Sequence, residues 1–393
     1  MKKITKYIII YAFIQGIIHN IGHPITPAFL IDREIPSYMF GIYFAVMSIG
    51  LALGGPFWGM LSDKYKKDRF FIILSLIIYS ISQAGFGYTN TLFFHLIFRF
   101  LSGVSVACTF TIYMSLMVKT TTKDIRAKAL AFYAAATTLG TSIGYFLGGF
   151  LNTNSYIISI LKTNLFENVF FIQGFLNLFY AFFVLVTLRQ EKELVAQTNI
   201  ISLKENFQNI FKLEKHLLIF LFSLLLINIG AINLNKFIDV YFTDLGYTTQ
   251  ALGTFVMTTG FVSLITSIFI VPRFVKFKNK IKLIKIIQVI ASIIVVITFR
   301  AAPFIYYAYS IYMIYIIIQA IYLVTEQSYI AENVKEGSYG TLMGTRQLFI
   351  SLGMVIGPLI GGFIYNIKPT YLFDVSVLFI IAGVLILFKK HLV

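Results

Sequence analysis

Charged residues and cysteine are scarce in this sequence. Only 12% of its 393 residues are charged, about half the share in an average soluble domain. The single cysteine, Cys108, excludes an internal disulfide framework and a cysteine-based metal cluster. The sequence has no phosphate-binding Gly-Lys-Ser/Thr loop and no zinc signature, so it predicts neither an ATP-driven pump nor a bound metal or other cofactor. Nothing in it indicates a soluble catalytic domain, and we expect no enzymatic activity.

Long apolar runs take the place of the missing charge. Hydrophobic residues make up 58% of the chain, and runs of about 20 residues, long enough to cross a bilayer as a helix, recur throughout. Strands of a membrane barrel would be about half as long and would alternate in polarity. The sequence therefore predicts an all-α membrane protein with twelve spans, near residues 7–30, 38–61, 70–88, 91–117, 127–152, 167–188, 215–243, 249–272, 280–299, 303–332, 339–365 and 368–388.

The amino-terminal residues Lys2 and Lys3, followed by an apolar run, imitate a secretory signal peptide. We disfavour that interpretation because the run continues to Leu30, lacks a small-residue cleavage site and is followed by further spans.

Basic residues indicate how the chain is oriented. Most of the 32 Lys and Arg residues fall in the amino terminus, in alternate loops and in the carboxyl terminus, an excess that is typical of cytoplasmic segments. We therefore predict a multi-pass protein of the cell membrane with both termini in the cytoplasm. This pattern explains the net charge of +16 without a nucleic-acid partner. This count includes the adjoining ends of the spans, where Arg346 falls, and the two basic residues that lie deeper inside spans are Arg99 and Lys236.

The two halves of the chain resemble each other. We predict a first six-helix bundle over 1–188, a polar cytoplasmic loop over 189–214 and a second bundle over 215–393. Asn20-Ile21-Gly22 in the first span recurs as Asn228-Ile229-Gly230 in the seventh. A glycine-rich segment of the fifth span recurs at constant offset in the eleventh. Paired halves with a site between them are the plan of many secondary transporters.

The loop after the second span carries the most specific motif. It reads Gly59-Met-Leu-Ser-Asp63-Lys64-Tyr-Lys66-Lys-Asp68-Arg69 and resembles the signature loop of the major facilitator superfamily, G-x-L-a-D-r-x-G-r-k. Lys66 stands where the family usually has Gly, and Asp68 where it usually has a base. The resemblance implies two pseudo-symmetric six-helix bundles that rock about a central site, and a monomer.

The same resemblance implies a conformational latch built on Gly59. Asp63 would lie at the amino end of the eleventh helix, where the helix dipole favours a carboxylate. Lys64 or Arg69 would pair with an acid after the fourth span, for which Asp124 is the candidate. The alternative is a cytoplasmic loop that is merely positively charged.

The fourth span reads Arg99-Phe-Leu-Ser-Gly103, which is similar to the R-x-x-q-G motif of the twelve-helix drug:proton antiporters. An Arg inside a span costs at least about 2.5–3.5 kcal/mol, so we expect Arg99 to face the central cavity. Snorkelling of Arg99 to the outer surface is the alternative.

The glycine-rich segments of spans five and eleven predict close helix packing. Their principal residues are Gly140, Gly144, Gly353, Gly357 and Pro358. The version in the eleventh span resembles the antiporter motif that the family usually carries in span five, where this chain has Tyr145 in place of Pro. Ordinary small-residue packing is the alternative for both segments.

Three ionisable residues are candidates for proton coupling: Glu326, Arg99 and His23. Removing a carboxylate from water favours its neutral form, so Glu326, late in the tenth span, could take up and release a proton. An acid already at the water interface is the alternative. His23 belongs to a polar cluster with His19 and Asn20 that precedes Pro24 and Pro27, and histidine titrates near neutral pH. Hydrogen bonds between packed helices are the alternative for this cluster.

Polar residues at mid-depth are candidates for lining a substrate cavity: Asn20, Asn228, Asn233, Gln319 and Tyr315. Hydrogen bonds between packed helices are the alternative for each. Tyr306 and Tyr307 could also line a pocket for flat cations. For Lys236 with Asp239, a structural pair is favoured, and for Asp374 a place at the membrane interface.

The sequence thus predicts a proton-coupled antiporter that exports lipophilic or cationic compounds, with protons, small molecules and membrane lipids as its partners. One alternative is a carrier for a defined metabolite such as a sugar, amino acid or siderophore. A second is a membrane protein that does not transport, such as a sensor or a lipid-modifying enzyme.

Overall fold

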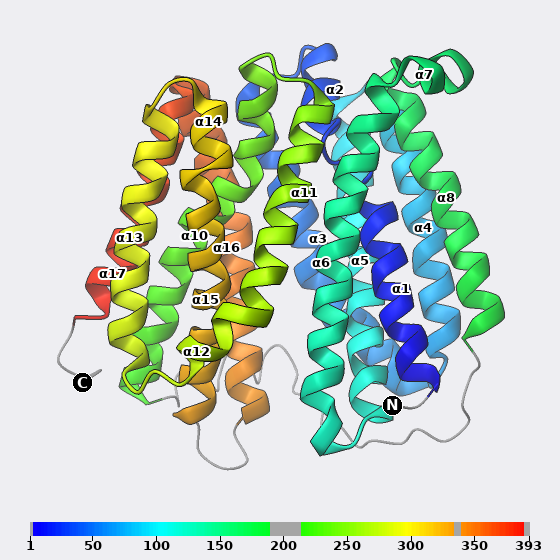
Figure 1. The fold of residues 1–393 in the computed structure, drawn as a ribbon. Coiled ribbons are helices and arrows are strands. Elements are labelled where there is room, and N and C mark those ends of the chain that lie inside the picture. The colour runs from blue at the N-terminus through cyan, green and yellow to red at the C-terminus, as the bar shows by residue number, and fades with distance from the viewer. Residues whose placement is uncertain (1–2, 189–213, 334–338, 389–393) are drawn as a thin grey trace. The chain divides into compact units, whose positions relative to one another are not determined.

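The computed structural model describes residues 3–188, 214–333 and 339–388, and every regular element in these ranges is a helix (Figure 1). The helices are α1 (Lys3–Asn20), α2 (Thr26–Asp32), α3 (Ser37–Tyr65), α4 (Asp68–Tyr88), α5 (Leu92–Thr120), α6 (Lys123–Thr153), α7 (Ser155–Leu161), α8 (Phe166–Thr187), α10 (Lys215–Asp244), α11 (Thr249–Ile265), α12 (Val271–Val275), α13 (Lys280–Arg300), α14 (Phe304–Tyr309), α15 (Ile311–Glu332), α16 (Tyr339–Ile367) and α17 (Pro369–Ile386). A π-helical turn, Thr266–Ile270, joins α11 to α12.

Eleven stretches of the described chain are helical, long and apolar enough to cross a membrane. They coincide with the second to twelfth predicted spans. The first predicted span, 7–30, consists of α1 and α2 with a turn at residues 21–25 between them. Pro24 and Pro27 lack the N–H that would continue the helical hydrogen bonds. Between them, Thr26 donates its N–H to Gly22 O at 3.0 Å.

The α11–α12 span is also irregular. The π-helical turn precedes Pro272 in α12, which cannot donate a backbone hydrogen bond and so favours a bulge in the turn before it. The tenth predicted span has a similar interruption at Ser310, between α14 and α15.

Contacts group the chain into two compact units. The first unit comprises the described residues of 1–35, 46–200 and 242–260, and the second unit those of 36–45, 201–241 and 261–393. Each unit therefore includes a short segment from the other predicted half. The predicted boundaries at 188 and 214 adjoin residues 189–213, which lie outside the described residues, so that division stays a prediction.

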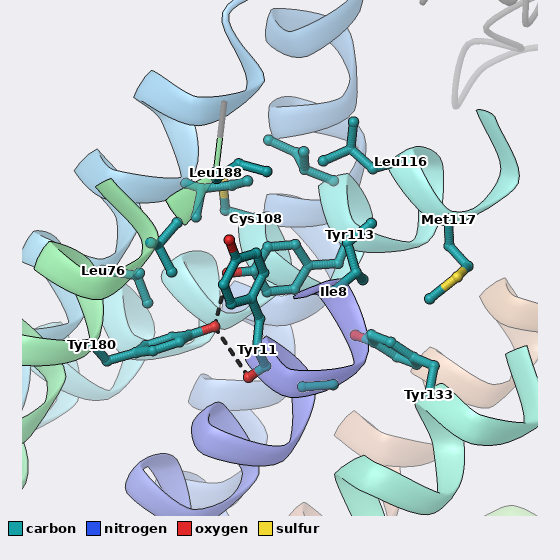
Figure 2. Close-up of a cluster of buried hydrophobic side chains, with 14 of the residues drawn as sticks. Ile8, Tyr11, Leu76, Cys108, Tyr113, Leu116, Met117, Tyr133, Tyr180 and Leu188 are labelled. Carbon is teal, nitrogen blue, oxygen red and sulfur yellow. Dashed lines mark hydrogen bonds between the residues drawn. The ribbon is translucent and has the colours of Figure 1, made fainter. Parts of the chain in front are cut away.

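The first unit packs around α1. This helix lies along α6 and α8, while α4 packs on α8 and α5. Its core contains three buried tyrosines from α1, α5 and α8 (Figure 2). Tyr180 donates its hydroxyl to Tyr11 O at 3.1 Å. Because Tyr180 has a single hydroxyl proton, the 2.8 Å contact between Tyr113 and Tyr180 is donated by Tyr113.

Close contacts between α1 and α6 require glycine at both predicted positions of the fifth span. A Cβ atom on Gly140 would lie 2.3 Å from Phe13 O, and one on Gly144 would lie 2.3 Å from Ile17 O and 3.0 Å from Asn20 Cβ. Real Cβ atoms do not approach a backbone oxygen this closely, so the small residues allow the two helices to touch along their backbones.

In the second unit α16 packs on α10 in a similar way, but one helical turn out of step. Asn228, the counterpart of Asn20, has its Cβ 3.1 Å from the Cβ position of Gly353, although the sequence repeat pairs Gly353 with Gly140 and not with Gly144. Gly357 is less crowded, because its Cβ position lies 3.0 Å from Ile229 O. The repeated motif is therefore shifted by about one turn relative to its partner helix.

Candidate functional site

Glu326 and Arg346 form a buried ion pair in the second unit. Glu326, on α15, is 1% exposed. Arg346, on α16, places its Nε 3.0 Å from each carboxylate oxygen, and one terminal nitrogen also donates to Oε1. This two-pronged arrangement is the strong form of an Arg–carboxylate contact. The burial argues against the alternative that Glu326 is an acid at the water interface.

A second ion pair joins helices of the same unit nearer the end of α15. Lys280, the first residue of α13, lies with its Nζ 2.8 Å from Glu332 Oε1, and the Glu332 side chain is 56% exposed. The two acids of α15 thus differ in environment. Glu332 is in contact with solvent, whereas Glu326 is enclosed, so only the latter has its charge held by a single partner in a low-dielectric interior.

Arg99 is 6% exposed and points inward in the first unit, which argues against snorkelling. One terminal nitrogen donates to Thr26 Oγ1 at 3.1 Å, and the guanidinium carbon lies 4.4 Å from the centre of the Phe86 ring. Gly103, four residues on, allows α5 to reach α3, because its Cβ position is 2.1 Å from Met47 O. Arg99 is therefore held at the start of α2 by hydrogen bonding and a cation–π contact.

His19 is enclosed at the end of α1. Its Nε2 lies 3.0 Å from Asn177 Oδ1, and its ring stacks on Tyr79 at 3.9 Å. Asn177 donates from Nδ2 to Leu76 O at 2.7 Å, which identifies Oδ1 as the acceptor and places a proton on His19 Nε2. Gln15 presents its amide nitrogen 3.4 Å from the other ring nitrogen, so the network favours a neutral His19.

His23, the predicted coupling histidine, lies in the turn between α1 and α2. Its ring stacks on that of Tyr145, from α6, with 5.5 Å between ring centres. Tyr145 is the residue that replaces Pro in the glycine segment of span five. The break in the first span, at His23, is therefore in contact with the position of span five at which Tyr145 replaces the usual proline.

The predicted cavity residues divide into two groups. Asn20 donates to Gly16 O at 2.7 Å and to Thr141 Oγ1 of α6 at 3.2 Å, and Asn228 donates to Leu224 O at 2.8 Å, so both side chains already have partners in the chain. By contrast, several buried polar atoms in the second unit have no hydrogen-bond partner in the described chain: both amide atoms of Asn233, the Tyr315 hydroxyl and Gln319 Nε2.

These unsatisfied groups come from two helices of the second unit. Asn233 is on α10, and Tyr315 and Gln319 share a face of α15, four residues apart. The rings of Phe220 of α10 and Tyr329 of α15 are in tilted contact, with 4.5 Å between their centres, which shows that these helices meet. Buried polar groups in proteins are normally hydrogen-bonded, so this set is suited to a partner that is not part of the chain.

The signature loop has a defined backbone. Lys66, which occupies the usual glycine position, has φ = +55°, a left-handed conformation that glycine adopts at no steric cost. Asp68 begins α4 and accepts a hydrogen bond from Ser62. Arg69 donates to Leu185 O of α8. The side chains of Asp63 and Asp124 lie outside the described residues, so the predicted latch pairing remains a prediction.

The remaining candidates are scattered. Lys236 lies over the Phe44 ring at 5.7 Å, and Asp239 is buried. Asp374 pairs with Arg300 between α17 and α13, and both side chains are partly exposed, in keeping with an interface position. Tyr306 is 71% exposed and does not line an internal pocket.

Sequence reasoning missed four residues that the structure brings to these sites. Arg346 was available as a signal, because it is an ionisable residue inside the eleventh predicted span, twenty positions after Glu326. Gln173, Asn177 and Tyr79 contact α1 from helices far apart in sequence. No local pattern connects them to the first span.

Comparison with known proteins agrees with these features. The family model described as Major Facilitator Superfamily matches residues 4–335. The chain is 24% identical over 367 residues to Multidrug resistance protein 1 of Bacillus subtilis (strain 168), covering 92% of this chain and 89% of that protein. It is 22% identical over 380 residues to Quinolone resistance protein NorA of Staphylococcus aureus (strain MRSA252), covering 94% and 92%.

The fold is likewise shared with solved structures. A bacterial homologue of the human lysosomal transporter Spinster superposes with a TM-score of 0.81 at 16% identity, over 99% of this chain and 97% of that one. This likeness confirms the predicted fold class, an all-α membrane protein with twelve spans. The chain therefore belongs to the major facilitator superfamily and is a multi-pass membrane transporter.

Proposed function

We propose that this transporter is a proton-coupled antiporter that exports lipophilic or cationic compounds from the cell by alternating access. Support comes from relatives named as multidrug and quinolone resistance proteins that align over more than nine-tenths of the chain. The observation that carries the coupling is the buried pair of Glu326 with Arg346.

The chemistry of this pair suits a proton switch. While Glu326 is ionised, the pair is neutral and buried. Protonation of one carboxylate oxygen leaves the positive charge of Arg346 without a counter-charge in a low-dielectric interior, which is strongly unfavourable. The second unit would relieve that cost by moving to a state in which Arg346 is hydrated, and release of the proton on the other side would restore the pair. Arg99 and His23 would serve the first unit, near the turn that interrupts its first span.

The substrate would contact the unsatisfied polar groups of the second unit. Asn233, Tyr315 and Gln319 offer donors and acceptors but no net charge. They favour substrates with a hydroxyl, carbonyl or amide group beside an apolar body, and this observation also supports the alternative of a carrier for a defined polar metabolite. Asn20 and Asn228, which are already hydrogen-bonded, would contribute shape more than recognition.

The signature loop would act as the latch of the cytoplasmic side, in the membrane orientation predicted from the basic residues. Gly59, Asp63, Lys64, Arg69 and Asp124 are its proposed members. In this proposal Arg69 leaves Leu185 O to pair with Asp124 in the other conformational state. Charge removal at Asp124 would therefore change the balance of states and leave substrate recognition intact.

Transport by purified protein in sealed vesicles tests the proposal. An imposed proton gradient is expected to drive ethidium against its concentration gradient in the unmodified protein. The double variant Glu326→Gln/Arg346→Gln, which removes both charges together, should lose gradient-driven transport and keep downhill exchange. Glu332→Gln is the matched control, because it changes the exposed acid of the same helix and should transport normally.

Three outcomes would each correct the proposal in a different way. Gradient-driven transport by the double variant would remove Glu326 from the coupling mechanism. Failure of ethidium with success of a neutral sugar or amino acid in the same vesicles would favour the metabolite carrier. Transport that ignores the proton gradient altogether would exclude proton coupling.

A further inference from the structure

Two side chains from other helices hydrogen bond the last carbonyl oxygens of α1. Gln173 of α8 donates from Nε2 to Ile18 O at 2.9 Å, and Tyr79 of α4 donates its hydroxyl to His19 O at 3.2 Å. A helix leaves its final carbonyl oxygens without intrahelical partners. These two contacts therefore stabilise the point at which the first span breaks.

The contact with Ile18 fixes the orientation of the Gln173 amide. Since a carbonyl oxygen can only accept, the amide atom that faces it has to be the nitrogen. The same Nε2 also lies 3.1 Å from the Tyr79 hydroxyl, so both of its protons are used. The amide oxygen Oε1 is thereby directed away from these partners. Gln173 is 1% exposed, and Oε1 has no hydrogen-bond partner in the described part of the chain.

A small cavity adjoins Gln173 at the turn between α1 and α2. Its volume is about 10 Å³, roughly the space that the centre of one water molecule needs. Arg99, Thr26 and Gln83 are among its polar lining residues. Arg99 brings a fixed positive charge and several N–H donors, one of which is used by Thr26 Oγ1.

The chemistry of the lining restricts what can bind there. Arg99 disfavours a cation, and the volume of about 10 Å³ admits nothing larger than one water molecule. The occupant has to donate one hydrogen bond to Gln173 Oε1 and accept another from Arg99. Water meets all of these conditions, and buried waters typically satisfy polar groups of this kind.

We propose that the break in the first span binds one internal water molecule, which donates to Gln173 Oε1 and accepts from Arg99. Gln173 is then a positioning residue for Arg99, because it ties the guanidinium to α8 through the water. The water site stands on the geometry of the first unit alone. Only its consequence for transport rests on the proposed function.

Radiolytic footprinting of the purified protein tests the water site directly. A bound water generates hydroxyl radicals in place under an X-ray pulse, and these oxidise side chains that touch it. Tyr79 lines the cavity and is 2% exposed, whereas Tyr113 is fully buried in the dry core of the same unit. We expect Tyr79 to be oxidised several-fold faster than Tyr113 in the unmodified protein. Equal slow oxidation of the two tyrosines would overturn the proposal.

The variant Gln173→Met removes the acceptor at nearly constant side-chain length. We expect oxidation of Tyr79 to fall to the level of Tyr113, and unchanged fast oxidation in a folded variant would also overturn the site. If the variant does not fold, the comparison in the unmodified protein still decides. In vesicles the folded variant should show a shifted pH profile of transport, whereas a purely structural role would lower the amount of active protein without moving the profile. Fast oxidation of Tyr79 in the unmodified protein, combined with an unshifted pH profile in the variant, would support the water site and contradict the role of Gln173 in positioning Arg99.

Discussion

Arg346 meets Glu326 edge-on, with its Nε 3.0 Å from both carboxylate oxygens and a terminal nitrogen bonded to one of them. The carboxylate is 1% exposed and its partner 9% exposed. A contact of this kind can leave the net stability nearly unchanged, since desolvation of the charges offsets their attraction, but it makes each charge depend strongly on the other. That dependence gives the pair its proposed sensitivity to a proton.

Removal of one charge should destabilise the protein far more than removal of both. Arg346→Gln leaves a buried carboxylate alone, and breaking such a pair typically costs about 3–5 kcal/mol. In Glu326→Gln/Arg346→Gln neither charge remains, and two amides can hydrogen bond each other. Thermal unfolding followed by circular dichroism should place the double variant closer to the unmodified protein than either single variant. Destabilisation of the double variant that equals the sum of the singles would contradict this coupling.

Replacement of Lys66 by glycine should stabilise the first unit. Lys66 has φ = +55°, and a left-handed conformation costs a residue with a Cβ atom roughly 1–2 kcal/mol. The gain is partly offset because glycine has more freedom in the unfolded chain, so we expect a net gain of up to about 1 kcal/mol. Lys67→Gly is the matched control: it removes the same charge where φ is −111°.

The single thiol of the chain provides the measurement. Cys108 is fully buried and donates to Phe71 O at 3.4 Å, so it reacts with a maleimide only when the first unit opens. On heating, the thiol should react at a higher temperature in Lys66→Gly and at an unchanged or lower temperature in Lys67→Gly. An equal rise in both variants would assign the effect to charge and not to backbone conformation.

Loss of the Tyr180 hydroxyl should destabilise the same unit. Tyr180 gives its proton to Tyr11 O and receives one from Tyr113, so Tyr180→Phe leaves the buried Tyr113 hydroxyl without its acceptor, while Tyr11 O keeps its partner within α1. A buried hydroxyl left unsatisfied costs about 1–3 kcal/mol. Thr187→Val, which removes the partner of the Tyr11 hydroxyl at the margin of the core, should cost less. Thiol reactivity of Cys108 on heating ranks the two variants, and the reverse order would refute the hydrogen-bond assignment.

The spans could be predicted from the sequence because hydropathy alone decides which segments can lie in a bilayer. The loop at 59–69 and the repeat of glycines were equally legible, since both are local patterns. The family preference for glycine at position 66 indicated the left-handed backbone found at Lys66. The one-turn shift of α16 against α10 could not be predicted, because a repeat in sequence does not specify the register between two packed helices.

Only part of each candidate site could be predicted, because local sequence patterns do not specify which helices pack together. Glu326 and Arg99 stand out as charges in apolar segments, whereas Arg346 was placed with the basic residues of the inner loops. Gln173 contacts Ile18 of the first span, although the two residues are 155 positions apart in the sequence. The sequence around Gln173 gives no indication of that contact. Polar groups in membrane interiors find partners through tertiary packing, so the chemistry of a site emerges only when the helices are assembled.

A methyl group on Gly144 tests the close packing of α1 and α6. The added Cβ would lie 2.3 Å from Ile17 O, so Gly144→Ala has to push the helices apart. Overpacking of this kind typically costs about 1–3 kcal/mol and occasionally more. Gly59→Ala is the matched control in the same unit, because its Cβ would meet only Thr111 Cγ2 at 3.6 Å, an ordinary contact. Gly357→Ala, with its nearest backbone oxygen at 3.0 Å, should be intermediate in its effect on thermal unfolding. Equal unfolding temperatures for all three variants would mean that these helices do not touch as described, and that the repeated glycines serve some purpose other than close approach.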